Sequence, residues 1–173
     1  GADADWDPTT DERGETPLMT AVSVYELGIV DLLIRRGADL ERRGGAVDGG
    51  TALDLGIAFA ATREVDRLVE AGAELGTQDR AAGAGALDEL RRHLQDSVPT
   101  DRAVVGATIN ARFRCLAALR EAGADLRANY GEASLLHWAA WYGRPEVVEH
   151  LLSHGLDPTA VDPNHGRTPR DWA

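Results

Sequence analysis

The sequence predicts an all-α fold built from stacked pairs of short antiparallel helices. Two short segments recur along its 173 residues, and three copies of one lie a constant 21 residues before the glycine that begins the other. The composition agrees, because 43% of the residues are hydrophobic but only 5% are aromatic. A core of Ala, Leu and Val suits closely packed helices better than a β-sandwich, which favours β-branched and aromatic residues.

The first recurring segment is Gly-Ala-Asp-Leu at residues 37–40. Variants of it occur at 72–75, 123–126 and, more loosely, 155–157, so the marker glycines are 35, 51 and 32 residues apart. Because a second marker keeps a constant distance from three of these glycines, an internal repeat is the simplest explanation.

The second marker is Thr-Pro-Leu at residues 16–18. It recurs as Thr-Ala-Leu at 51–53 and Ser-Leu-Leu at 134–136, each time 21 residues before a marker glycine, and Thr168-Pro169 opens the pattern once more. A hydroxyl followed by Pro is typical of a helix start, because the side chain caps free amides and Pro tolerates the first turn. Each marker therefore predicts the beginning of a first helix.

A second, apolar-periodic helix follows in each unit, as Ile29, Val30, Leu32 and Leu33 illustrate. Gly37 is expected to end that helix in the left-handed conformation. One helix pair cannot bury its apolar faces alone, so the pairs are expected to stack.

The combined pattern, T-P-L-x-x-A and then V-x-x-L-L-x-x-G-A-D, resembles the ankyrin repeat. The resemblance is close over residues 11–76 and 129–161, and the best copy runs from Ser134 to Asp157. It implies an ankyrin-repeat solenoid of helix pairs with hairpin loops, in a single domain spanning 1–173. The repeats are expected at 11–43, 44–76, 77–128 and 129–161, with a partial fifth at 162–173.

The third repeat departs from the pattern, because 51 residues separate its marker glycines. We expect its first helix to begin near residues 85–88 and its second to span about 112–122, with a helical insertion at 96–111 between them. In the alternative alignment, residues 100–109 form the first helix and 85–95 the inserted one.

The ankyrin family binds other proteins through a concave face, so the resemblance implies a partner-binding surface on the first helices and hairpin tips. The residues expected there are Trp138, Trp141, Tyr142, Tyr130, Phe59, Leu55, His93, Arg92, Glu89, Glu132 and Glu15. Three of the nine aromatic residues, at 138, 141 and 142, lie within five positions. Large rigid aromatic side chains often anchor partners, but these could equally pack between neighbouring repeats.

Other reactive side chains have ordinary structural explanations. His137 holds the position at which the family's histidine bonds to backbone between repeats. Glu146, His150 and His154 are spaced four apart, but their order is not that of a metalloprotease, so we expect no metal and no cofactor. Cys115 lies among apolar residues of a second helix and is expected to be a buried, inert thiol.

The charge of the chain limits its partners. All 18 basic residues are Arg, and 29 Asp and Glu bring the net charge to −11. The absence of Lys excludes Schiff-base and phosphate-loop chemistry, and the acidic excess opposes binding to nucleic acid or anionic membrane. The Arg residues, such as Arg35, Arg36, Arg63 and Arg67, are expected mostly at variable surface positions.

These observations predict a non-enzymatic protein-binding module, an adaptor, inhibitor or regulator, whose partner is a protein with a basic surface. With a single Cys and no visible leader segment, a cytoplasmic setting is expected, and the abundance of Ala, Gly and Arg is typical of a GC-rich bacterial genome. Two alternatives remain open. The chain could be an enzyme or small-molecule binder that uses the third-repeat insertion, or the ankyrin portion of a larger protein.

Overall fold

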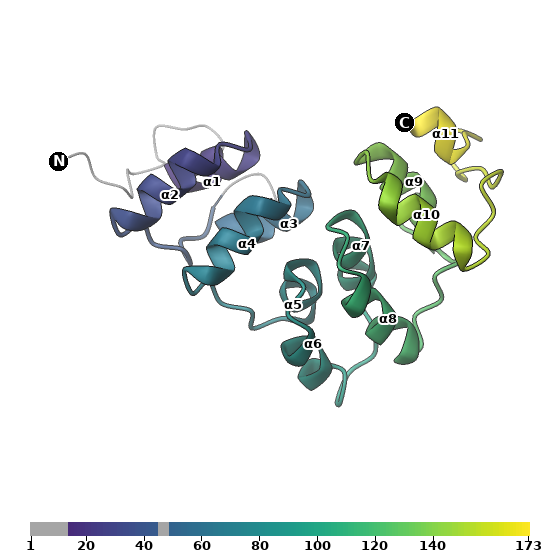
Figure 1. The fold of residues 1–173 in the computed structure, drawn as a ribbon, viewed down its shortest axis with the longest axis horizontal. Coiled ribbons are helices and arrows are strands. Elements are labelled where there is room, and N and C mark those ends of the chain that lie inside the picture. Colours follow the sequence, from purple (N-terminus) through teal and green to yellow (C-terminus); the bar gives the residue numbers. More distant parts are fainter. Residues whose placement is uncertain (1–13, 45–48) are drawn as a thin grey trace. The chain divides into compact units, whose positions relative to one another are not determined.

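The computed structural model describes residues 14–44 and 49–173, and in this part of the chain the secondary structure consists of helices and one two-stranded hairpin (Figure 1). It divides into an N-terminal unit that ends at Gly76 and a C-terminal unit that begins at Thr77, and each is described by itself. The helices of the N-terminal unit are α1 (Pro17–Ser23), α2 (Leu27–Arg35), α3 (Ala52–Ala58) and α4 (Thr62–Glu70).

The C-terminal unit contains the remaining elements. These are α5 (Gln78–Ala84), α6 (Leu87–His93), α7 (Asp101–Ile109), α8 (Phe113–Glu121), β1 (Asn129–Tyr130), β2 (Ala133–Ser134), α9 (Leu135–Trp141), α10 (Pro145–Ser153) and α11 (Pro169–Trp172). The two strands form an antiparallel hairpin in which Tyr130 pairs with Ala133. The predicted all-α fold of paired helices is therefore confirmed.

The helix starts predicted at Thr16 and Thr51 agree with the structure. Thr16 caps α1 by accepting a hydrogen bond from the backbone of Met19 at 3.2 Å, and Pro17 occupies the first turn. Thr51 and Asp54 form a reciprocal capping box at the start of α3. These local bonds satisfy backbone amides that the first turn of a helix leaves unpaired, so the Thr-Pro-Leu marker acts through capping.

Four of the five helix pairs that the structure describes contain two sharp reversals of the chain. The marker glycine after the second helix has a positive φ, +82° at Gly37 and +106° at Gly123, which confirms the left-handed conformation expected there. The turn inside the pair also requires positive φ, yet Tyr25, Ala60 and Ala111 occupy it at φ of 54–60°. Non-glycine residues are strained in this region, so tertiary packing must hold these three turns.

The long interval between Gly72 and Gly123 contains two complete helix pairs, α5–α6 and α7–α8. The extra segment is helical, as predicted, but our favoured alignment was wrong. Residues 101–109, assigned to the insertion, are the first helix that packs against α8. The alternative alignment, with the inserted helix at 85–95, describes α6 correctly.

The first helix of the extra pair, α5, escaped prediction because its cap, Thr77, is not followed two positions later by the Leu that follows Thr16, Thr51 and Ser134. Thr77 nevertheless caps it, accepting a hydrogen bond from the backbone of Arg80 at 3.2 Å. The Gln78 side chain then fixes the link to α7: its amide donates to Ser97 Oγ and Val98 O, both at 3.0 Å, and its carbonyl accepts from Thr100 N at 2.6 Å. A tight, side-chain-bonded link replaces the hairpin in this pair.

The first helices of the C-terminal unit form a row, with α5 against α7, α7 against α9, and α9 against α11 (Figure 1). Small buried residues, Ala81 and Ala82 on α5 with Ala103 and Ala107 on α7, let the first two approach closely. The larger buried side chains, among them Leu116, Leu119, Leu135, Leu136 and Leu151, fill the space between first and second helices.

Several Arg residues connect neighbouring pairs rather than lying unused on the surface. Arg112 Nε donates to the carbonyl of Gly83 at 3.2 Å, and Arg144 Nε donates to that of Ile109 at 2.9 Å. In both cases the acceptor lies at the carboxyl end of the preceding first helix, where carbonyls lack partners within the helix. In the N-terminal unit, Arg67 forms an ion pair with Asp31 at 2.5 Å.

Candidate protein-binding site

The hairpin and α9 place the predicted aromatic residues. Tyr130 faces inward, 6% exposed, and its hydroxyl donates to the carbonyl of Asp125 at 2.9 Å. Burial is the largest influence on the phenol and raises the pKa of Tyr130, and the nearby carboxylates of Asp101 and Asp125 raise it further. The buried ring holds the hairpin against the start of α9.

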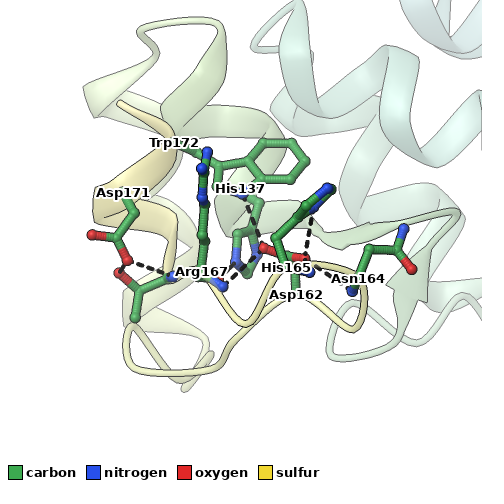
Figure 2. Close-up of polar contacts among 8 residues, drawn as sticks. His137, Asp162, Asn164, His165, Arg167, Asp171 and Trp172 are labelled. Atoms are coloured by element: carbon green, nitrogen blue, oxygen red, sulfur yellow. Dashed lines mark hydrogen bonds and ion pairs between the residues drawn. The ribbon is translucent and has the colours of Figure 1, made fainter.

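His137 has the structural role predicted for it. It is fully buried, and its Nδ1 shares a hydrogen bond with Ser134 Oγ at 2.7 Å while its Nε2 bonds to the carbonyl of Arg167 at 2.9 Å. Because that carbonyl can only accept, Nε2 carries the proton. His137 therefore ties α9 to the loop before α11, a contact visible in Figure 2.

The loop before α11 is organised by Asp162, whose side chain is 1% exposed. Its carboxylate accepts from the backbone of Asn164 and His165 at 3.0 and 2.6 Å, and from Arg167 N and Trp172 Nε1 at 3.0 and 3.2 Å (Figure 2). Burial, the largest single influence, raises the pKa of Asp162, but these hydrogen bonds outweigh it and lower the pKa to about 2. The loop is built around an ionised carboxylate.

Trp172 on α11 is the centre of an aromatic cluster that sequence analysis did not identify. Its ring makes edge-on contacts with His137, Trp138 and Trp141, with centroids 5.3, 5.7 and 6.0 Å apart. A signal was available, because Trp172 follows the cap residue Thr168 by four positions, as Trp138 follows Ser134. Edge-on packing of this kind is favourable for aromatic rings.

The two tryptophans of α9 differ in how far they are exposed to solvent. Trp138 is half-buried, and its indole nitrogen donates to the carbonyl of Tyr130 at 3.1 Å. Trp141 is 64% exposed although one edge rests on Trp172. Tyr142 ends the helix and is half-buried. Of the three predicted anchors, Trp141 presents the most surface to a partner.

Several other predicted partner-binding residues are not on the surface. Glu15, Leu55 and Tyr130 are 6%, 2% and 6% exposed, so the expected exposure of these three was wrong. Leu55 is a buried residue of α3. Phe59 ends α3 and is half-buried, and its carbonyl accepts the hydroxyl of Tyr25 at 2.9 Å. Glu132 is exposed in the hairpin, as expected.

The partner-binding residues predicted in the third repeat lie on a second helix of a pair and not on a first helix. Glu89, Arg92 and His93 belong to α6, which packs beside the second helix α8, and not to a first helix as expected. Glu89 forms an ion pair with Arg92 and lies 3.4 Å from His93 Nε2. Trp138 is two pairs further along, with α7–α8 between, so these residues do not gather into one pocket with it.

The groups considered for metal or thiol chemistry have structural surroundings. In the part of the chain that the structure describes, no three His, Cys, Asp or Glu side chains are arranged to hold a metal ion. The His150 ring packs between the rings of Phe113 and His154, whose centroids are 4.8 and 4.4 Å away. Burial is the largest cause that lowers the pKa of His150, and the nearby charges of His154 and Arg120 lower it further. Cys115 is buried, and burial raises the pKa of its thiol.

No helix among residues 14–44 and 49–173 is both long and apolar enough to cross a membrane.

Comparison with known proteins agrees with the helix pairs. The family model described as "Ankyrin repeat" matches residues 13–44 and 132–163. Over 73 residues the chain is 37% identical to Palmitoyltransferase AKR1 of Lachancea kluyveri, a stretch that covers 41% of this chain and 10% of that protein. The chain therefore spans about a tenth of the length of this curated relative.

The first family match covers α1 and α2, and the second covers the hairpin strand β2, α9 and α10. Both segments thus have the matched sequence and the expected helix pair, and the remaining pairs stack beside them in each unit. The chain therefore contains ankyrin repeats over these two segments.

Proposed function

We propose that the chain is a non-enzymatic protein-binding module, and that its partner contacts the first-helix face of the C-terminal unit around Trp141. Ankyrin repeats are in general protein-interaction modules. The observation that carries the proposal is the exposure of Trp141, 64%, on a helix whose neighbouring aromatic residues are packed. An exposed tryptophan held by a rigid neighbour loses little conformational freedom on binding and is a common anchor.

The partner we propose has a basic surface. Asp101 at the start of α7, Asp125 and Glu132 around the hairpin, and Asp171 on α11 are exposed carboxylates on the segments that flank α9. A net charge of −11 adds a long-range attraction for cationic surfaces. Such charges mainly accelerate association and make it sensitive to salt, while Trp141 supplies apolar contact.

A quantitative capture experiment tests this proposal. The wild-type chain, Trp141→Ala and the control Leu152→Ala would be immobilised in equal amounts and exposed to an extract of the source cells, at low and high salt. Leu152 is 40% exposed but lies on the second helix α10. We expect one set of proteins to be lost with Trp141→Ala, retained with the control, and weakened by salt. Equal capture by all three chains would contradict the proposed site.

The enzyme alternative has less support, because the third-repeat residues on which it depends lie on α6, away from Trp138. That the chain is the ankyrin portion of a larger protein, and that it comes from a bacterium, stay predictions. The full-length gene product would decide both.

A further inference from the structure

Helix α2 exposes the apolar side chains of Ile29 and Leu32 to solvent, and these two, together with Tyr25 in the turn before the helix, are called the α2 stripe. The exposed fractions of Tyr25, Ile29 and Leu32 are 57%, 48% and 44%, and Val24 beside them is 55% exposed. The spacing of three residues places Ile29 and Leu32 on one side of the helix. Tyr25 lies just before the helix, at a φ of +60°. Val30, on the opposite side, is fully buried.

The equivalent positions of α8 are buried, and so is the first of the two in α10. Counted from the cap residue, Ile29 and Leu32 are third and sixth in α2, and the same places in α8 belong to Cys115 and Ala118, which are 1% and 7% exposed. The third place in α10 is Val147, 1% exposed. Cys115, Ala118 and Val147 belong to the hydrophobic core of the C-terminal unit. The α2 stripe thus has the chemical character of a helix-packing face, although it is exposed.

We propose that the α2 stripe packs against the α2 stripe of a second copy of the chain, with the two helices antiparallel. The stripe is self-complementary when inverted about a point midway between Ile29 and Leu32. Ile29 then meets Leu32 of the second copy, and Leu32 meets its Ile29. A two-fold contact of this kind uses the same patch on both subunits and closes on itself.

The charges at the ends of the stripe favour the antiparallel arrangement. Arg36, which is exposed at the end of α2, would lie beside Tyr25 and Glu26 of the second copy, also exposed. A guanidinium is attracted both to an aromatic face and to a carboxylate. The Tyr25 ring is already oriented by its hydroxyl bond to Phe59 O at 2.9 Å. Parallel packing would instead bring the two Arg36 side chains together.

Sedimentation equilibrium of the complete chain tests the contact. Between about 2 and 200 μM, the range in which interfaces smaller than the standard size dissociate, the wild type should pass from monomer to dimer. Leu32→Arg should raise the dissociation constant at least about tenfold, the effect of roughly 1.4 kcal/mol. The matched control is Leu152→Arg on α10, which replaces a residue of similar exposure, 40%, and should dimerise like the wild type.

Two further variants test the orientation. In a mixture of Ile29→Cys and Leu32→Cys chains, the mixed disulfide should form faster than either homodimer disulfide, because residue 29 faces residue 32 only in the antiparallel pair. The buried Cys115 is common to all chains. Arg36→Glu should weaken dimerisation, and Glu26→Arg added to it should restore it.

Three results would overturn the proposal: a wild type that stays monomeric at the highest concentration, a dimer that Leu32→Arg leaves intact, or preferential 29-to-29 cross-linking. The first would leave the stripe to a different partner. If Leu32→Arg proves unfolded by circular dichroism, Leu32→Ala replaces it, with the same direction of effect expected.

Discussion

Replacing Trp138 and Trp141 by Ala should have different consequences for stability. Trp138 would lose its hydrogen bond to Tyr130 O, worth about 1 kcal/mol, its contact with Trp172, worth about 0.5–1.5 kcal/mol, and the burial of most of its indole. The sum is roughly 3–5 kcal/mol, in the usual range for removing a packed tryptophan. Trp141 is 64% exposed and keeps only its edge contact with Trp172, so its removal should cost about 1 kcal/mol.

Thermal and urea unfolding of the two variants measure this difference. For a chain of this size each kcal/mol moves the melting temperature by about 2–4 °C, so Trp138→Ala should lower it by roughly 6–20 °C and Trp141→Ala by about 2–4 °C. Trp138→Phe, which keeps a ring but loses the indole donor, should fall between them. Because repeat arrays can unfold in steps, hydrogen exchange in α9 and α11 serves as a local check. Equal losses, or a larger loss for Trp141→Ala, would refute this account of the cluster.

Three further substitutions test the packing. Gly56→Ala should destabilise the chain by about 1–3 kcal/mol despite the better helix propensity of Ala, because its Cβ would lie 2.9 Å from Val65 Cγ2; Gly28→Ala, with nothing within 4 Å, should be neutral or stabilising in the same urea titration. Gln78→Leu removes three hydrogen bonds to the link before α7 and should cost about 2–3 kcal/mol, with faster amide exchange at residues 97–100. Asp162 has its pKa lowered from 3.8 to about 2, so its contribution is complete above about pH 4 and is lost as the pH falls toward 2. The melting temperatures of wild type and Asp162→Asn should therefore differ at pH 6 and converge near pH 2; a constant difference would contradict this.

The helix starts and ends could be predicted from sequence because they depend on neighbouring residues. Thr16 with Pro17, and Thr51 with Asp54, cap helices within three or four positions of the chain, and Gly37 ends one through its own conformational freedom. The family resemblance adds the order of these signals. Local chemistry of this kind is readable without knowledge of the tertiary structure.

The extra helix pair could not be placed in this way. Thr77 is a cap without the Leu that marks the predicted helix starts two positions after the cap. The link that follows α6 is fixed by Gln78, about twenty residues earlier in the chain. Nothing near residues 94–100 indicates that partner. The alignment error then moved Glu89 and His93 from a second helix to a first helix.

The exposure of the predicted site residues depended on distant contacts as well. Tyr130 and Asn129 are adjacent in a strand, and only the pairing of the hairpin decides that Tyr130 is the one that faces inward. Trp138 and Trp141 are the same residue type on the same helix, but Trp172, which contacts both, comes from the following repeat. The sequence indicated an aromatic surface but not which of its members remains exposed.

Site-specific photo-cross-linking tests the proposed binding face most directly. A photoreactive phenylalanine at position 141, and separately at Val98, which is 80% exposed on the link between α6 and α7, would be activated in an extract of the source cells. The account predicts a discrete adduct with one protein from position 141, weakened by salt, and none of that size from position 98. Identical adducts from both positions, or none from 141 while the wild-type chain still captures its partner, would contradict it.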